Sequence, residues 1–332
     1  MTAETIEVSD GVYAYIQPDG SWYINNTGFL AGRSGVVSID TCSTERRTRA
    51  YLDAVAAVTR APVRTLVNTH HHGDHTYGNC LLPAATIVGH TRCREEVLAG
   101  PPPVNTGIFT DVDWGELTVT PPFLTYETGI TLWVDDLRCE VTYVGTPAHT
   151  TNDSIVFIPS RSVLFAGDLL FNGGTPFLLM GSVSGAVEVL EQVIRPLGAA
   201  TIVAGHGPVC GPSLIDDMLG YLRFVQDVAR RASAAGLTPL EAARETDLGG
   251  YADLLDAERI VGNLHRAYIE VAAEAGAEVA AGAEVAAEAE VAAGTGAGAG
   301  TGAGGRGSPV DVIAALTDMV AYNGGRPLTC HA

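Results

Sequence analysis

The segment THHHGDHTYGN holds four histidines and one aspartate between His70 and His75. His70 and His72 are two residues apart, so their side chains point to the same side if this segment ends an extended strand. Two imidazoles in that arrangement can bind one metal ion. Histidine is also a common polar surface residue, and this pair alone is equally consistent with a solvated loop. The interpretation as a metal site therefore depends on further ligands elsewhere in the chain.

The second half of the same segment offers ligands for another ion. Gly73 allows the backbone to turn, and this turn would direct Asp74 and His75 away from the first pair of histidines. His71 is expected to point away from both groups. The order of residues therefore predicts two adjacent metal sites.

Three more candidate ligands follow predicted strands. His149 lies in GTPAHTTND after the strand CEVTYVG, Asp168 lies in FAGD after SVLF, and His206 lies in AGHG after TIVAG. Each of them stands near a glycine or a proline. Strand ends that lead into loops are where layered α/β folds usually hold functional residues. We therefore expect these side chains to meet the histidine segment.

Together the candidate ligands form two sites of three residues that share a carboxylate. The assignment is His70, His72 and His149 in the first site, Asp74, His75 and His206 in the second, and Asp168 as the bridge. Imidazole and carboxylate groups are the ligands that borderline and hard divalent metals prefer. Two metal ions about 4 Å apart lower the pKa of a shared water toward neutrality and polarise a substrate carbonyl.

The elements that must position these ligands alternate between strands and helices. GVYAYIQ, SWYINNTGFLAG and VVSID are typical strands, because apolar and polar residues alternate and Val, Ile and Tyr are frequent. A helix is expected from about Thr44 to Thr59, and RTLVNTH is a short strand that ends in the histidine segment. This alternation predicts layered sheets flanked by helices for the catalytic domain, residues 1–210.

After Pro212 the pattern is helical only, so residues 211–332 are expected to form a C-terminal helical region with a boundary near Cys210. A low-complexity tract at 271–307 interrupts this region, and it repeats Glu-Val-Ala-Ala four times before a run of Gly, Ala and Thr. We expect the alanine-rich part to extend the preceding helix and the glycine-rich part to be a flexible linker. The segment SPVDVIAALTDMVAY then returns to pack as a final helix.

Composition limits the partners and the location of the protein. The formal charge is −19 and all 19 basic residues are arginine, so nucleic acid is an unsuitable partner. Six cysteines without Cys-x-x-Cys spacing indicate reduced thiols, and Cys80 is expected to be a packing residue. The chain contains neither an apolar run long enough to cross a membrane nor a start typical of an export signal, which predicts a cytoplasmic protein without a membrane partner.

The ligand pattern carries a family resemblance. HHHGDH, read as H-x-H-x-D-H, and the later His149, Asp168 and His206 resemble the five ordered motifs of the metallo-β-lactamase superfamily. The match runs from about Val12 to His206 and includes Asp40 at the end of VVSID. The resemblance implies an α+β fold, a four-layer αββα sandwich with a C-terminal helical appendage. It also implies a metal pair at one edge between the two sheets, with two zinc ions as the expected cofactor and iron or manganese as the alternatives.

Single positions narrow the branch of this superfamily. Class B β-lactamases carry a cysteine where this chain has Asp168, and flavodiiron proteins carry a glutamate where it has His72. The nuclease branches are disfavoured by the acidic surface and by the absence of a large inserted nuclease domain. What remains is the hydrolase group of glyoxalase II, lactonases and thioesterases, together with the mononuclear iron sulfur dioxygenases.

One smaller branch is more similar in its segments. THHHGDHTYGN, VGTPAHTTNDS, FAGDLLFNGGTPF, NLHRAY and MVAYNGGRP resemble the metallo-β-lactamase-like cyclases and thioesterases of bacterial aromatic (type II) polyketide biosynthesis. This resemblance implies a metal-dependent hydrolase, a thioesterase or cyclase of antibiotic biosynthesis, in which Asp74 also orients the attacking water. A glyoxalase II-like hydrolase, a lactonase, an iron sulfur dioxygenase and a degenerate binding module remain the alternatives.

The expected substrate is an aromatic or poly-β-keto acyl thioester, free or bound to an acyl carrier protein. Tyr77, Phe171 and Phe177 flank the metal motifs and could line a pocket for it, although packing in the core is the simpler explanation for them. Arg46, Arg47 and Arg49 are the candidate docking residues for an acidic carrier protein, which the acidic remainder of the chain would repel. The sequence leaves open whether the chain forms a homodimer.

Overall fold

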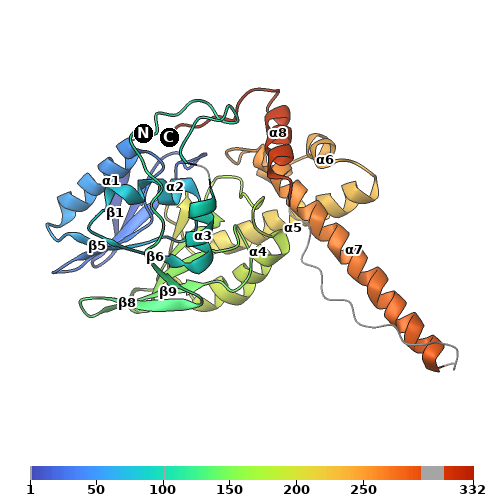
Figure 1. The fold of residues 1–332 in the computed structure, drawn as a ribbon, viewed down its shortest axis with the longest axis horizontal. Helices are drawn as coiled ribbons and strands as arrows, with labels where there is room; N and C mark the ends of the chain where they lie inside the picture. The colour runs from blue at the N-terminus through green and yellow to red at the C-terminus, as the bar shows by residue number, and fades with distance from the viewer. Residues whose placement is uncertain (1, 101, 293–309) are drawn as a thin grey trace.

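The computed structural model describes residues 2–100, 102–292 and 310–332, and two β-sheets form its centre (Figure 1). The first sheet has seven strands in sequence order: β1 (Glu4–Ser9), β2 (Val12–Ile16), β3 (Thr27–Ala31), β4 (Val36–Ile39), β5 (Val63–Val67), β6 (Thr86–His90) and β7 (Leu124–Tyr126). Strands β1 to β4 are antiparallel, whereas β4 to β7 are parallel. The histidine segment, His70 to His75, therefore follows a parallel strand, β5, at its carboxyl end.

The second sheet has five strands in the order β12-β11-β10-β9-β8. Their bounds are β8 (Gly129–Val134), β9 (Leu137–Tyr143), β10 (Ser154–Ile158), β11 (Val163–Phe171) and β12 (Thr201–His206). Only the β11–β12 pair among these neighbours is parallel, so both of these strands run toward the same edge of the sheet. Asp168 and His206 are brought to that edge together.

Alternation along the strands decides which residues lie between the sheets. In β3, Leu30 joins the cluster shared with Val156 and Phe165 of the second sheet, whereas its neighbour Phe29 packs on the opposite face against Tyr51. This is the two-residue period of a strand that is covered on both faces. Gly28 leaves room for a side chain of the second sheet, because a Cβ there would collide with the ring of Phe165.

Helices cover both outer faces and complete the αββα sandwich that was predicted. They are α1 (Glu45–Val58), α2 (Gly73–Thr76), α3 (Thr91–Ala99), α4 (Val183–Val189), α5 (Ser213–Ala234), α6 (Pro239–Glu245), α7 (Arg259–Ala292) and α8 (Val312–Tyr322). Short turns of 3₁₀ or π-helix occur at Tyr77–Leu81, Pro159–Arg161, Leu190–Ile194, Arg195–Leu197 and Gly249–Tyr251. None of the helices in the described part of the chain is long and apolar enough to cross a membrane.

Helix α1 shows how the sequence sets an element. The side chain of Thr44 accepts a hydrogen bond from the backbone N–H of Arg47, which caps the helix, and the buried residues Thr48, Tyr51 and Val55 lie on one face. The helix ends at Val58, so the expected span from Thr44 to Thr59 is confirmed within a residue at each end.

The C-terminal helices share a core with the second sheet. Leu164 and Ile202 of the sheet belong to the same buried cluster as Leu222 of α5, Leu264 of α7 and Met319 of α8. The position near Cys210 falls between β12 and α5, and buried contacts cross it. The alanine-rich repeats continue α7 to Ala292, whereas the glycine-rich part of the tract that was expected to be a linker, 294–307, lies outside the described residues.

Phe165 provides a test of the packing between the sheets. Its side chain is 2% exposed and its ring lies against Gly28, so Phe165→Ala should leave a cavity and lower the free energy of unfolding by about 3–5 kcal/mol. The matched control is Phe123→Ala, because Phe123 is 83% exposed and its loss should change stability by less than about 0.5 kcal/mol. Urea denaturation followed by circular dichroism measures both, and equal effects of the two substitutions would contradict the assigned core.

Candidate metal centre

The candidate ligands reach one place from both sheets. The histidine segment follows β5 of the first sheet, and His149 lies in the loop between β9 and β10. Asp168 belongs to β11, and His206 is the last residue of β12. The structure thus brings together all seven side chains that the sequence selected as metal ligands.

The first group consists of His70, His72, His149 and Asp168, whose ligand atoms lie within 4.8 Å of one another. His149 Nε2 lies 2.8 Å from His72 Nδ1 and 3.4 Å from Asp168 Oδ2. His70 Nε2 lies 4.0 Å from the same carboxylate oxygen. Three imidazole nitrogens and one carboxylate therefore face a common point, which is the donor set of a single metal ion.

The second group consists of Asp74, His75, His206 and, again, Asp168. His75 Nε2 lies 3.0 Å from Asp168 Oδ1, and His206 Nε2 lies 3.3 Å from Asp168 Oδ2 and 3.3 Å from Asp74 Oδ2. Asp168 is thus common to both groups, as a carboxylate that bridges two ions would be.

Unpaired buried atoms test whether these residues fit metal ions. His70 Nε2, His75 Nε2 and Asp168 Oδ1 are buried and make no hydrogen bond of suitable geometry within the described structure, although the last two lie only 3.0 Å apart. Leaving buried polar atoms without a partner is costly, and such atoms in a native protein require an explanation. All three point into the space that the two groups enclose, so bound ions would satisfy them. The residues fit a pair of divalent metal ions, and the donor set suits zinc, iron or manganese.

The far side of each ligand ring is held by a hydrogen bond. His149 Nδ1 donates to the carbonyl oxygen of Phe177 at 2.5 Å, His206 Nδ1 donates to that of Gly20 at 3.0 Å, and His75 Nδ1 donates to Asp40 at 2.8 Å. These bonds hold a proton on Nδ1 and turn Nε2 toward the space between the groups, where it can bind a metal. The ring of His72 has the opposite orientation: its Nε2 faces the sulfur of Met180, and its Nδ1 faces the other ligands of the first group.

Asp40 links the first sheet to the centre. Its carboxylate accepts hydrogen bonds from the backbone N–H and the hydroxyl of Thr69, both at 2.7 Å, in addition to the bond from His75. The backbone of Asp40 has a φ of +59°, an uncommon conformation for a residue other than glycine. Only the family resemblance drew attention to this residue in the sequence.

Burial and neighbouring charges divide the histidines into two kinds. Burial, together with the other histidines, holds the pKa of His70 and His72 well below its usual value, so both rings are neutral and ready to bind a metal. Burial opposes the charged form of His206 as well, but Asp168 and Asp74 outweigh it and raise the pKa of His206 to about 9. In the absence of metal, the second group therefore holds a proton at neutral pH.

Details of the sequence-based expectations need correction. Asp168 lies inside β11 and not after its end. Gly167, directly before it, adopts a φ of +53°, and the pairing of β11 with β12 shifts there while the strand continues. Gly205 on the neighbouring strand leaves room for the Asp168 carboxylate, since a Cβ at Gly205 would collide with it. The role of Gly73 is also spatial, because it has no positive φ and a Cβ there would collide with the ring of Tyr77.

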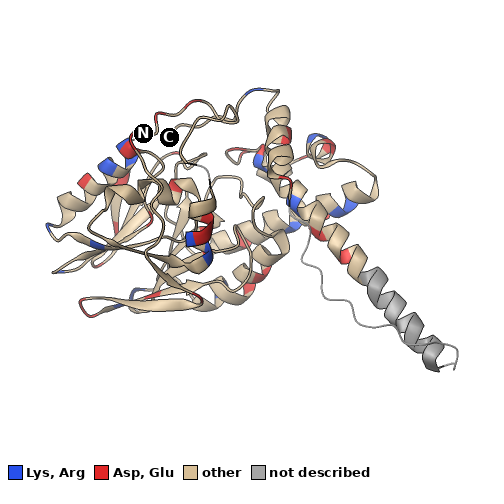
Figure 2. Cartoon of the chain, viewed as in Figure 1, with Lys and Arg blue, Asp and Glu red and all other residues tan. Residues whose placement is uncertain are grey.

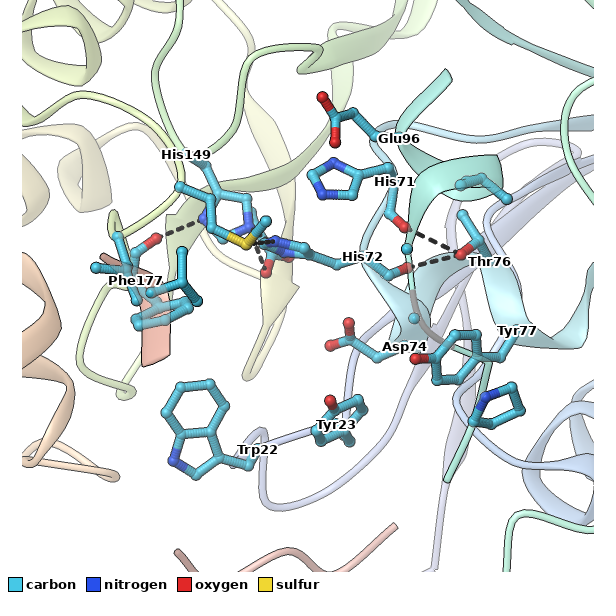
Figure 3. Close-up of a pocket in the computed structure, with 18 of the residues that line it drawn as sticks. Trp22, Tyr23, His71, His72, Asp74, Thr76, Tyr77, Glu96, His149 and Phe177 are labelled. Carbon is cyan, nitrogen blue, oxygen red and sulfur yellow. Dashed lines mark hydrogen bonds and ion pairs between the residues drawn. The ribbon is translucent and has the colours of Figure 1, made fainter. Parts of the chain in front are cut away.

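His71 also differs from the expectation. It belongs to neither ligand group, but its ring lines the pocket instead of pointing away from the site (Figure 3). Its Nδ1 lies 3.0 Å from the side-chain nitrogen of Asn152, and burial, followed by the charge of His149, lowers the pKa of His71 to about 4. His71 is therefore a neutral polar group on the pocket wall.

An apolar pocket of about 450 Å³ opens onto both groups (Figure 3). The three expected substrate residues, Tyr77, Phe171 and Phe177, line this pocket. Sequence reasoning missed most of the remaining wall, which includes Trp22, Tyr23, Phe109, Leu179, Met180, Arg259, Val312 and Leu316. The apolar pattern of the segment that forms α8 predicts that this helix packs against the protein, but it does not predict that the helix contacts this pocket.

The residues to which weaker roles were assigned have structural partners. Arg47 donates to Gln17 and to the carbonyl oxygen of His331, and Arg49 pairs with Glu45 at 2.7 Å. Both signs of charge therefore lie along α1 (Figure 2), which weakens the idea of a basic docking surface there. The thiol of Cys80 contacts the carbonyl oxygen of Tyr77, in agreement with a packing role.

Asp168→Asn tests the bridging role of this residue. The substitution removes the shared negative charge, so the second metal ion should be lost from the purified protein while far-ultraviolet circular dichroism stays unchanged. Metal analysis by plasma mass spectrometry gives the number of ions per chain, and Asp10→Asn on the exposed surface is the control. Two ions retained by Asp168→Asn would refute the assignment of the bridge.

Proton release provides a second test. Nearby carboxylates raise the pKa of His206 to about 9 and also raise that of His75, so a metal ion must displace at least one proton, and the apparent affinity of the second group should rise at least about tenfold per pH unit between pH 7 and 9. Calorimetric titration of the metal-free protein with Zn²⁺, in two buffers of different ionisation enthalpy at pH 7, should show at least one proton released. An affinity independent of pH with no proton release would contradict the geometry of this group.

The comparisons with known proteins agree with this geometry. The family model described as the metallo-beta-lactamase superfamily matches residues 20–206, which is more than half of the chain. A hydroxyacylglutathione hydrolase of Rhodospirillum rubrum is 31% identical over 142 residues, which are 42% of this chain and 47% of that protein. The subunit alpha of a 2,4-dinitroanisole O-demethylase from a Nocardioides species is 28% identical over 148 residues, 44% of this chain and 41% of that protein.

The chain thus spans about half the length of these curated relatives. Among solved structures, a metallo-beta-lactamase from Pontibacter korlensis superposes with a TM-score of 0.56 at 19% identity, and the match covers 67% of this chain and 99% of that one. This likeness supports the fold alone. The matched region contains every ligand of both groups, and the chain is a member of the metallo-β-lactamase superfamily.

Proposed function

We propose that this protein is a metal-dependent hydrolase that cleaves an acyl thioester with a large apolar or aromatic acyl group. One observation carries the proposal: two ligand groups that share Asp168 lie at the base of an apolar pocket of about 450 Å³. When bound, a pair of divalent ions supplies an activated water and polarises the carbonyl of the substrate. The residues of the chain then have to bind the substrate, orient the attacking water and exclude other water from the site.

In this proposal Asp74 orients the attacking water. Asp74 is 8% exposed, and its carboxylate faces the pocket and lies 3.3 Å from His206 Nε2 (Figure 3). A carboxylate there can accept a hydrogen bond from the attacking water and hold it against one face of the carbonyl. A thioester suits this site because a thiolate, with a pKa of about 8.5, leaves without a strong general acid.

The pocket wall favours an apolar acyl group over an anionic one. Among the described residues that line the pocket, Arg259 is the single arginine. Arg259 is ion-paired with Asp256 at 2.8 Å and lies 4.0 Å from the centre of the Trp22 ring, so it is already engaged. The carboxylates of a glutathione thioester would find no free cation there, whereas a flat acyl chain would find aromatic walls.

The names of two relatives are consistent with the cleavage of a thioester and with the binding of an aromatic group. Hydroxyacylglutathione hydrolase names a thioesterase, and 2,4-dinitroanisole O-demethylase names an enzyme for an aromatic substrate. The finer proposal rests on the resemblance of the sequence segments: a polyketide cyclase or thioesterase that uses two zinc ions in the cytoplasm, with its substrate free or on an acyl carrier protein. A glyoxalase II-like activity, a lactonase and an iron sulfur dioxygenase are the outcomes that would replace it.

A comparison of substrates tests the proposal. An aryl β-keto acyl thioester of N-acetylcysteamine should be hydrolysed with a kcat/KM at least tenfold above that for S-lactoylglutathione and for a simple homoserine lactone, because only the first matches the apolar walls. Faster turnover of either of the last two would move the protein to the glyoxalase or lactonase branch. One bound iron per chain, with oxygen uptake on a persulfide, would overturn hydrolysis altogether.

A further inference from the structure

One aromatic residue of the pocket has an unusual backbone. Tyr23, in the loop between β2 and β3, has a φ of +62°, a conformation that glycine adopts freely and that a bulky side chain rarely adopts. Backbone strain of this kind persists only where the surrounding structure enforces it, and it is concentrated at functional sites. The question is what holds Tyr23 in this conformation, and what its side chain reaches as a result.

The loop is fastened to the metal centre at both ends. His206 Nδ1 donates to the carbonyl oxygen of Gly20 at 3.0 Å, at the start of the loop. At its other end, the side-chain nitrogen of Asn26 donates to the carbonyl oxygens of Ala204 at 2.9 Å and of Gly207 at 2.6 Å. The loop that carries Tyr23 is thus fixed to β12 and to one of its metal ligands, so the two cannot move independently.

The ring of Tyr23 is fixed as firmly as its backbone. It lies edge-to-face against Phe109 and Trp114, each with a ring-centre distance of 5.3 Å. Its neighbour Trp22 donates to Glu258 at 2.7 Å, which ties this part of the loop to the C-terminal helices. Figure 3 shows that the hydroxyl of Tyr23 is directed toward Asp74, on the side of the pocket where the water would be held.

We propose that Tyr23 is a catalytic residue whose hydroxyl donates a hydrogen bond to the acyl oxygen of the substrate. The inference rests on the proposed thioester hydrolysis. As the water oxygen forms its bond to the carbonyl carbon, the electron pair of the C=O bond moves to the acyl oxygen, which then accepts the hydrogen bond from Tyr23. When the C=O bond reforms, the C–S bond breaks, and the thiolate leaves and takes up the proton that the water has lost.

A donor of this kind stabilises charge that exists only in the transition state. It is therefore expected to act on kcat and to have little effect on KM. Tyr23 keeps its own proton throughout the step, so water and the thioester give a carboxylic acid and a thiol with no further reactant. If Tyr23 served only to pack against Phe109, its ring alone would be sufficient, and removal of the hydroxyl would leave kcat unchanged.

Tyr23→Phe separates the two roles, because it removes the hydroxyl and keeps the ring. With S-benzoyl-N-acetylcysteamine as the probe, kcat should fall on the order of 10²-fold, with KM, metal content and melting temperature unchanged. Tyr13→Phe is the matched control, because it removes a hydroxyl that donates to Glu7 at 2.9 Å near the protein surface and should leave kcat unchanged.

The possible outcomes are distinguishable. A kcat for Tyr23→Phe within twofold of that of the parent protein would overturn the role of Tyr23 and leave the proposed function intact. A loss of kcat that only follows a loss of bound metal would also overturn it, since the hydroxyl would then be structural. If the parent protein with both metal ions fails to hydrolyse the thioester, the proposed function fails and the role of Tyr23 fails with it.

Discussion

The buried carboxylate of Asp168 sets the main constraint on this molecule. It is 5% exposed, and its oxygens lie between 3.0 and 3.4 Å from the Nε2 atoms of three histidines, one of them from each of three separate segments. A buried charge is tolerated only when opposite charges or metal ions compensate it. The segments that bring those histidines must therefore end at the same place, and the facing edges of two sheets provide such a place.

The same constraint explains the glycines and buried polar residues around the centre. Gly167 turns the strand at Asp168, and Gly205 leaves the space that the carboxylate fills. Asp40 fixes Thr69 and His75 of the first sheet, and the carbonyl oxygen of Gly20, in the loop between β2 and β3, fixes His206 of the second sheet. His75, His149 and His206 thus each have a second partner that determines which nitrogen faces the site, and this is how a rigid scaffold prepares a site before any ion arrives.

Local patterns in the sequence predicted much of this arrangement. Thr44 marked the start of α1, and the spacing of His70 and His72, with the later histidines after apolar runs, identified the ligands that the structure brings together. The place of Asp168 inside a strand could not be predicted, because it depends on the space beside Gly205 of a neighbouring strand. The pocket wall could not be predicted either, since Trp22 and Leu316 are separated by almost the whole chain and a single sequence does not indicate such contacts.

Diffraction at the absorption edge of the bound metal tests the central claim most directly. Crystals of protein purified without added metal should show two anomalous peaks per chain about 4 Å apart, with Asp168 in contact with both ions. The first ion should be bound by His70, His72 and His149, and the second by Asp74, His75 and His206. A single peak, or a carboxylate of Asp168 that contacts neither ion, would contradict the account.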